Sequence, residues 1–198
     1  MNADAPFADL PIDFVGSFPD PTHQLDPPQP EIAFLGRSNV GKSSLMNALV
    51  GRKIAKTSAT PGKTQLLNVF RFPRFYFLDL PGYGYALASG TSRRGFRRLV
   101  EGVLRDRERL VGVVWLLDIR HPPSRDDLTI RHLLGSAELR AVLALTKADK
   151  LSRTRQLAAR TARAEEIAIA ESELVVTSST AGTGLDLLAA RILDLVTE

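Results

Sequence analysis

One segment, residues 36–43, combines residue types that can hold the phosphates of a nucleotide. Its sequence, GRSNVGKS, fits the pattern G-x-x-x-x-G-K-[ST]. In such a loop the backbone N–H groups surround the phosphates, the lysine reaches the β- and γ-phosphates, and the final hydroxyl binds Mg²⁺. The residues expected to contact the nucleotide here are Gly36, Arg37, Ser38, Asn39, Val40, Gly41, Lys42, Ser43 and Ser44.

The segments on either side of this phosphate loop have the patterns of a strand and a helix. Residues 31–35 form a short apolar run that ends at Gly36, and apolar residues recur at helical spacing after the loop. A helix that begins here points its unpaired N–H groups, and the positive end of its dipole, at the phosphates. The context therefore favours phosphate binding.

A second polar segment, Asp79, Leu80, Pro81 and Gly82, follows the apolar run FYFL. An aspartate at a strand end opposite a phosphate loop can hold Mg²⁺, usually through a water. The N–H of Gly82 can contact a γ-phosphate and sense its loss. We therefore expect Asp79 to support the same metal ion as Ser43.

A third segment, Thr146, Lys147, Ala148 and Asp149, could select the base. A carboxylate in the plane of a purine accepts the N1–H and 2-amino groups of guanine, whereas adenine has an acceptor at N1 and no 2-amino group. Mispaired buried polar groups can cost factors of about 10⁴ to 10⁵ in selectivity, so Asp149 predicts guanine over adenine. The lysine stem can lie over the base. The alternative for an isolated segment of this kind is a charged surface loop.

A fourth segment, Thr177, Ser178 and Ser179, follows the run LVV. This turn of small residues could bring a backbone N–H to the guanine O6.

A polar connection at 57–65 contains a Pro-Gly breaker, which is typical of a loop. A nucleotide-dependent switch needs a hydroxyl here that closes on Mg²⁺ and the γ-phosphate, and Thr60 and Thr64 both have this chemistry. Gly62, Lys63 and Gln65 of the same loop are further candidates for nucleotide contact.

The elements that must position these segments alternate between strands and helices. Strands are predicted at 31–35, 66–72, 74–79, 111–118, 140–146 and 173–177, and helices at 43–51, 91–109, 125–135, 153–170 and 184–196. This alternation predicts an α/β fold, a mostly parallel sheet with helices on both faces and ligands at the carboxyl ends of the strands.

The first thirty residues differ in composition from the rest. They hold seven of the twelve prolines and five aspartates but no Lys or Arg, so with a net charge of +4 for the chain the remainder carries +9. We predict an acidic, proline-rich extension at 1–30, extended or partly disordered, before a domain at 31–198. A basic domain favours polyanion partners, of which RNA is the usual one in a cell.

The overall composition excludes several classes of protein. With 198 residues, 44% hydrophobic and 24% charged, the chain fits one globular domain. It has no apolar run long enough to span a bilayer and no pattern of a signal peptide. Zero cysteines exclude disulfides and Cys-ligated metals. We expect a cytoplasmic monomer with no membrane contact.

Five segments together resemble one family. They are GRSNVGKSS at 36–44, TPGKTQLLN at 60–68, DLPGYGYA at 79–86, DIRHPPS at 118–124 and TKAD at 146–149. The chain resembles the EngB (YsxC/YihA) family of bacterial ribosome-assembly GTPases, within the TrmE-Era-EngA-like translation-factor class of P-loop GTPases. The resemblance spans most of residues 31–180, and DLPGYGYA and DIRHPPS are its most particular parts.

This resemblance implies a three-layer P-loop GTPase domain with a six-stranded, mostly parallel sheet. It implies that GTP and GDP bind with Mg²⁺, that residues 57–66 and 82–92 order around the γ-phosphate, and that the partner is the large ribosomal subunit with its rRNA. Family members are also linked to septation and cell division.

The resemblance also assigns roles to single residues. It favours Thr64 over Thr60 as the Mg²⁺ ligand beside Ser43 and Asp79, and it suggests that Asn39 helps to hold a K⁺ ion. The alternative for Asn39 is a loop amide that only braces the switch. The residues expected to act in catalysis are Lys42, Thr64, Gly82 and Asn39.

One position predicts slow hydrolysis. Signalling GTPases have a glutamine after D-x-x-G that orients the attacking water, and Tyr83 stands there in this chain. We therefore expect intrinsic turnover of about 10⁻⁴ to 10⁻² s⁻¹, with stimulation by K⁺ or a ribosomal partner. The main alternative is an assembly scaffold that binds guanine nucleotide without useful turnover, and a small P-loop kinase is a further one.

The predicted helix at 91–109 is rich in arginine. It holds seven Arg against three acidic residues, and four of the arginines fall on the face opposite its apolar residues. These candidates for RNA contact are Arg94, Arg98, Arg105 and Arg109. The alternative is a solvated helix surface with balanced charges.

Overall fold

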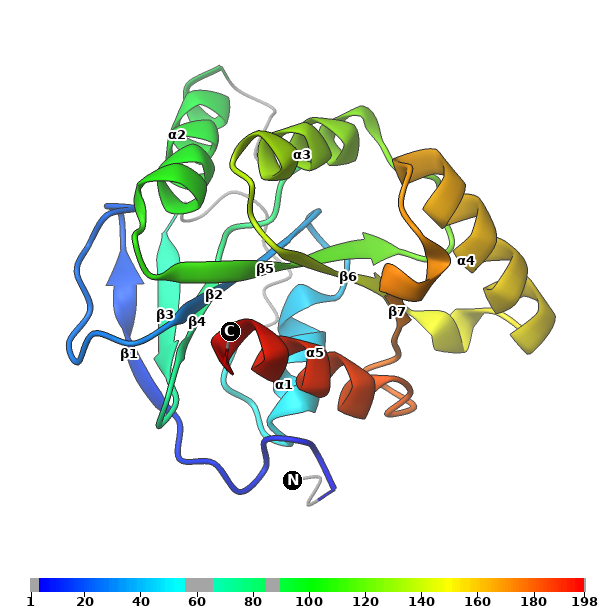
Figure 1. The fold of residues 1–198 in the computed structure, drawn as a ribbon, viewed down its shortest axis with the longest axis horizontal. Coiled ribbons are helices and arrows are strands. Elements are labelled where there is room, and N and C mark those ends of the chain that lie inside the picture. The colour runs from blue at the N-terminus through cyan, green and yellow to red at the C-terminus, as the bar shows by residue number, and fades with distance from the viewer. Residues whose placement is uncertain (1–3, 56–65, 85–89, 198) are drawn as a thin grey trace.

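A computed structural model describes residues 4–55, 66–84 and 90–197. Its centre is one seven-stranded sheet in the order β1-β3-β4-β2-β5-β6-β7 (Figure 1). The strands are β1 (Asp13–Phe18), β2 (Glu31–Gly36), β3 (Leu67–Arg71), β4 (Tyr76–Asp79), β5 (Leu110–Asp118), β6 (Ala141–Thr146) and β7 (Leu174–Val176). Five of them, β4, β2, β5, β6 and β7, are parallel neighbours, so their carboxyl ends share one edge.

Helices cover both faces of this sheet, so the predicted three-layer α/β class is confirmed (Figure 1). Side chains of α2 (Gly90–Asp106), α3 (Arg125–Ser136) and α4 (Arg153–Ile167) pack into one apolar cluster. Those of α1 (Lys42–Leu49) and α5 (Leu185–Thr197) pack into the other. Because the central strands are buried on both faces, they read as continuous apolar runs, and β2 is buried along its whole length.

The predicted count of six strands is wrong by one. The additional strand, β1, lies in the proline-rich segment and pairs antiparallel with β3 at the edge of the sheet. Its side chains are mostly exposed, with Phe14 and Val15 among them, so it lacks the one-sided apolar alternation that marks a strand in sequence. Further upstream, Phe7 is 2% exposed and packs edge-on against three phenylalanines of the sheet's apolar face, Phe72, Phe75 and Phe77.

The predicted end of the arginine-rich helix is also wrong, because α2 ends at Asp106 instead of residue 109. Beyond the helix, Arg107 turns inward and forms an ion pair with Glu31 in which both side chains are 4% exposed. The same guanidinium donates a 2.6 Å hydrogen bond to the Pro21 carbonyl. The helix therefore ends before Arg107, whose side chain neutralises the buried Glu31 at the start of β2, and Arg109 lies outside the helix.

None of the helices in the described ranges has the length and apolar character needed to cross a bilayer. Short 3₁₀ turns lie at Ala148–Lys150 after β6 and at Glu171–Glu173 before β7.

Candidate functional site

The phosphate loop connects β2 to α1 through backbone conformations that its glycines permit. Gly41, immediately before the helix, has a left-handed φ of 107°. A Cβ on Gly36 would lie 2.7 Å from the Val40 side chain, so this position requires glycine. The predicted strand, turn and helix are therefore in place, and α1 begins at Lys42 with its N-terminus at the loop.

The third segment, residues 146–149 at the end of β6, contacts the phosphate loop, which follows β2 two strands away in the sheet. The Thr146 hydroxyl donates a 2.6 Å hydrogen bond to the Val40 carbonyl, and Lys147 Nζ donates one of 2.6 Å to the Asn39 carbonyl. Thr146 is only 3% exposed, so its hydroxyl serves the loop backbone. The Lys147 stem therefore runs alongside the phosphate loop, as its predicted position over a base requires.

The fourth segment holds Asp149, the carboxylate that is expected to select the base. Asp149 Oδ1 accepts a 2.7 Å hydrogen bond from the Ser178 hydroxyl, and Lys150 Nζ lies 3.1 Å from Oδ2. The Ser178 bond, followed by the Lys150 bond, lowers the pKa of Asp149 from its ordinary value. The side chain is therefore ionised at neutral pH, which is the form that accepts hydrogen bonds from guanine.

The turn after β7 is tied to its surroundings by two of its three N–H groups. The Thr177 N–H donates to the Leu145 carbonyl at 2.7 Å, and the Ser178 N–H donates to the Thr183 carbonyl at 3.0 Å. Among the described residues, none accepts a backbone hydrogen bond from the Ser179 N–H. Of the three predicted residues, Ser179 therefore retains the donor that could face a base.

Asp79, at the end of β4, lies against the lysine of the phosphate loop. Lys42 Nζ forms an ion pair with Asp79 Oδ1, and Asn68 Nδ2 donates a 3.2 Å hydrogen bond to the other oxygen. Asp79 is 6% exposed. Its carboxylate and the Ser43 hydroxyl offer oxygen atoms, the ligand type that Mg²⁺ prefers. The two residues therefore fit the predicted metal.

Gly82 and Tyr83 run beside the phosphate loop. The Ser38 N–H donates to the Tyr83 carbonyl at 2.7 Å, and the Tyr83 N–H donates to the Gly36 carbonyl at 3.2 Å. The Ser38 hydroxyl donates to the Gly82 carbonyl at 3.1 Å. A Cβ on Gly82 would lie 2.9 Å from the Ser38 backbone, so only glycine allows this approach.

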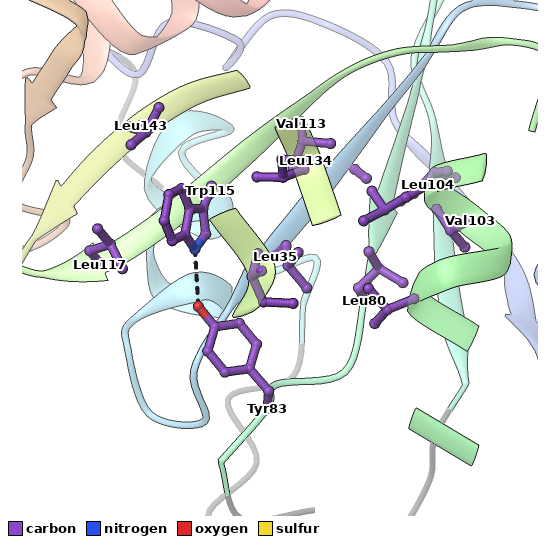
Figure 2. Packing of buried hydrophobic residues seen from close by; sticks show 14 of the residues in the cluster. Leu35, Leu80, Tyr83, Val103, Leu104, Val113, Trp115, Leu117, Leu134 and Leu143 are labelled. Atoms are coloured by element: carbon purple, nitrogen blue, oxygen red, sulfur yellow. Dashed lines mark hydrogen bonds between the residues drawn. The ribbon is translucent and has the colours of Figure 1, made fainter. Parts of the chain in front are cut away.

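The side chain of Tyr83 points into the apolar cluster, towards Trp115 (Figure 2). It is 1% exposed and its ring packs against Phe96 of α2. A side chain buried in this way does not orient a water, which agrees with the expected lack of a glutamine equivalent at this position.

A cavity of about 210 Å³ lies between the phosphate loop and the segment after β5. Its lining includes Asp118 and His121, two residues to which the sequence assigned no role in the site. Burial by itself would raise the pKa of Asp118, but hydrogen bonds from Arg120 and Lys147 lower it far below its ordinary value. Lys147 Nζ lies 3.0 Å from Asp118 Oδ2, so Asp118 fixes the lysine of the third segment. The sequence could have indicated Asp118 as a site residue, because it lies at the carboxyl end of a predicted central strand.

The remaining predicted contacts, Gly62, Lys63, Thr64 and Gln65, lie outside the described residues, as does Thr60. The structure therefore brings together residues 36–44, 79–82, 146–149 and 177–179 at one edge of the sheet.

Comparison with known proteins identifies relatives along most of the chain. The family described as "50S ribosome-binding GTPase" matches residues 31–147. A probable GTP-binding protein EngB of Heliobacterium modesticaldum is 46% identical over 166 residues, covering 80% of this chain and 81% of that protein. The protein of the same name from Desulfatibacillum aliphaticivorans is 44% identical over 184 residues, covering 92% and 90%.

A solved structure has the same fold. The crystal structure of a probable GTP-binding protein EngB superposes with a TM-score of 0.70, at 22% identity, over 84% of this chain and 98% of that one.

Proposed function

The chain belongs to the EngB family of GTP-binding proteins, and from this membership we propose that it is a slow GTPase that acts as a nucleotide-dependent switch in the cytoplasmic assembly of the large ribosomal subunit. Through ribosome supply, the same activity would support septation and cell division.

The observation that carries the proposal is the position of Asp149, which lies in the same segment as the two residues that hold the phosphate loop. Ser178 and Lys150 stabilise its charge, and Thr146 and Lys147 of the same segment hold the loop's backbone. A carboxylate in this position discriminates by hydrogen bonding between guanine and adenine. A preference for ATP over GTP would contradict both this role and the family assignment, and would favour a P-loop kinase.

The phosphate chemistry is assigned to the loop and its neighbours. Lys42 and the loop N–H groups neutralise charge that develops on the β- and γ-phosphates. Ser43, Asp79 and Thr64 would hold Mg²⁺, which would supply positive charge to the phosphates during hydrolysis. Asn39 is the candidate for a K⁺ contact. Because the Tyr83 side chain is buried, hydrolysis without a partner would be slow.

The proposed partner is rRNA, and the arginines of α2 support this choice. Arg94, Arg97, Arg98 and Arg105 line a groove of about 500 Å³ together with Glu101, Gly102 and Asp106 of the same helix and with Asp20, Pro21 and Thr22. Pro21 packs so closely on α2 that a Cβ on Gly102 would lie 2.5 Å from its ring. The candidate contacts Arg94, Arg98 and Arg105 therefore share one groove, whereas the fourth, Arg109, lies beyond the helix.

Multiple-turnover GTPase assays test the enzymatic part of the proposal. We expect turnover that rises on addition of K⁺ or large ribosomal particles. If neither addition raises the rate, the result would favour the alternative function, an assembly scaffold that binds guanine nucleotide without useful turnover.

Sedimentation with isolated ribosomal subunits tests the switch. We expect co-sedimentation with the large subunit in the presence of a non-hydrolysable GTP analogue, and loss of it with GDP. Equal association with the analogue, GDP and no nucleotide would contradict a nucleotide-dependent role.

A further inference from the structure

A buried tyrosine hydroxyl connects the nucleotide-sensing segment to two other elements. The Tyr83 hydroxyl donates a 2.6 Å hydrogen bond to Asp127 Oδ1 of α3 and accepts one of 3.0 Å from Trp115 Nε1 of β5. Figure 2 shows the Trp115 bond within the apolar cluster. All three residues are at most 2% exposed. Burial is the first cause that raises the pKa of Tyr83 above its ordinary value, so its hydroxyl keeps its proton and remains a donor.

The other oxygen of Asp127 fixes the start of α3. Asp127 Oδ2 accepts hydrogen bonds from the Ser124 N–H at 2.7 Å and from the Ser124 hydroxyl at 2.6 Å. Ser124 in turn caps the Asp127 N–H, which completes a capping box. Because this carboxylate is held from two sides, Asp127 is a rigid acceptor for the Tyr83 hydroxyl.

The backbone of the same tyrosine lies on the phosphate loop. Two backbone hydrogen bonds join Tyr83 to Gly36 and Ser38, and the preceding Gly82 contacts Ser38 directly. Within the described part of the chain, the Gly82 N–H makes no backbone hydrogen bond, so this donor beside the loop is free for a ligand. The Tyr83 side chain thus fixes the position of the N–H that would contact a γ-phosphate.

We propose that Tyr83 is a positioning residue that helps the protein to discriminate between GTP and GDP. Because Asp127 and Trp115 hold its hydroxyl, Tyr83 keeps Gly82 beside Ser38. This position of Gly82 raises the affinity for GTP and leaves the affinity for GDP unchanged. The inference rests on the proposed function, because it assigns the γ-phosphate contact to Gly82. A γ-phosphate and the Tyr83 hydroxyl restrain the same segment in the same place, so each strengthens the other.

Replacing Tyr83 with Phe removes the hydroxyl and keeps the ring. We expect the ratio of GTP to GDP affinity to fall roughly fivefold, at the lower end of typical couplings between linked sites. Titration with a non-hydrolysable GTP analogue and with GDP measures it. The matched control is Tyr76→Phe, which removes another buried hydroxyl, bonded to the Pro27 carbonyl at 2.9 Å; Tyr76 begins β4, whose other end carries Asp79. An unchanged ratio in Tyr83→Phe, or an equal fall in the control, would overturn the proposal.

A second pair of variants acts from the other end of the same bond. Asp127→Ala removes the acceptor of the Tyr83 hydroxyl and part of the α3 cap, whereas Ser124→Ala weakens the cap and leaves Tyr83 Oη its partner. We expect the affinity ratio to fall in Asp127→Ala alone. A fall of the same size in Ser124→Ala would mean that cap stability, and not Tyr83, sets the ratio.

Trp115 supplies a direct reporter, because it is the single tryptophan of the chain. We expect its emission to differ between the GTP-analogue and GDP complexes of the unmodified protein, and this difference to disappear in Tyr83→Phe. Equal emission from the two complexes, or a difference that persists in the variant, would contradict the proposal. If the unmodified protein bound GTP no better than ATP, the proposed function itself would fail. If the unmodified protein bound and hydrolysed GTP, and Tyr83→Phe had the same affinities and the same rate, only the inference about Tyr83 would fail.

Discussion

Ser178 donates its hydroxyl to Asp149 at 2.7 Å, across the ends of the neighbouring parallel strands β6 and β7. The residues are 29 positions apart in sequence, and parallel pairing brings them to the same edge. Ser178 is 1% exposed, so its donor is rigidly placed. The acceptor that we propose for the base is therefore charged and held in place by the protein itself, which lowers the cost of ordering it on binding.

Replacing Asp149 with Asn should weaken GTP binding about 100-fold or more, because two hydrogen bonds to a charged acceptor are each worth about 1.5–3 kcal/mol. The new amide donates where guanine also donates, but it complements a 2-oxo group, so xanthosine triphosphate should gain affinity. Competition against a fluorescent GDP analogue measures both changes. Unchanged GTP affinity would show that Asp149 does not contact the base.

Replacing Lys42 with Met should lower the affinity for GTP and also destabilise the protein. The Lys42 and Asp79 side chains are 11% and 9% exposed, so the variant leaves a nearly buried carboxylate without its cation. We expect the free energy of unfolding to fall by about 2–4 kcal/mol, measured by urea denaturation without nucleotide. Adding Asp79→Asn should restore part of that loss while GTP binding stays weak; independent, additive losses would show that the two residues are not coupled.

Replacing Asp118 with Asn should destabilise the protein in a pH-dependent way. The lowered pKa of Asp118 means that its contribution is complete above the unfolded-state pKa of about 3.9 and is lost as the pH falls towards the folded-state value. We expect the variant to be less stable by about 1 kcal/mol at pH 7, a modest figure because the group is partly solvated. Urea unfolding should show this difference shrinking below about pH 4. A difference that is constant with pH would point to lost packing instead of lost charge.

Replacing Phe7 with Ala should cost about 3 kcal/mol of unfolding free energy, because a fully buried aromatic ring leaves a cavity among Phe72, Phe75 and Phe77. The control is Phe14→Ala on β1, where the ring is 59% exposed and the expected change is below about 0.5 kcal/mol. Similar small changes in both variants would indicate that the first residues contribute nothing to the folded domain.

The sequence predicted the elements of the central sheet well, since strands buried on both faces appear as continuous apolar runs followed by loop residues. It missed β1, whose pairing with β3 depends on backbone hydrogen bonds that leave no apolar pattern. It extended α2 to residue 109, because helical periodicity does not reveal that Arg107 pairs with Glu31, 76 residues away.

The polar segments singled out in the sequence come together at one edge of the sheet, but the sequence could not distinguish residues that could face a ligand from those that support the backbone. Thr146 belongs to the base-selecting motif, yet its hydroxyl bonds to a carbonyl 106 residues away. The sequence also could not predict the direction of the Tyr83 side chain, because that direction depends on an acceptor from α3, Asp127, and a donor from β5, Trp115.

The hydrogen bonds from Thr146 and Lys147 to the phosphate loop restrict how base preference can evolve in this chain. These two residues support the Val40 and Asn39 carbonyls, so we expect substitutions there to disturb the phosphate loop as well as the proposed base site. Asp149, in contrast, does not support the phosphate loop, since its side chain contacts Ser178 and Lys150. Selection for a different nucleotide could therefore act through position 149 alone, while positions 146 and 147 stay constrained by the loop that they support.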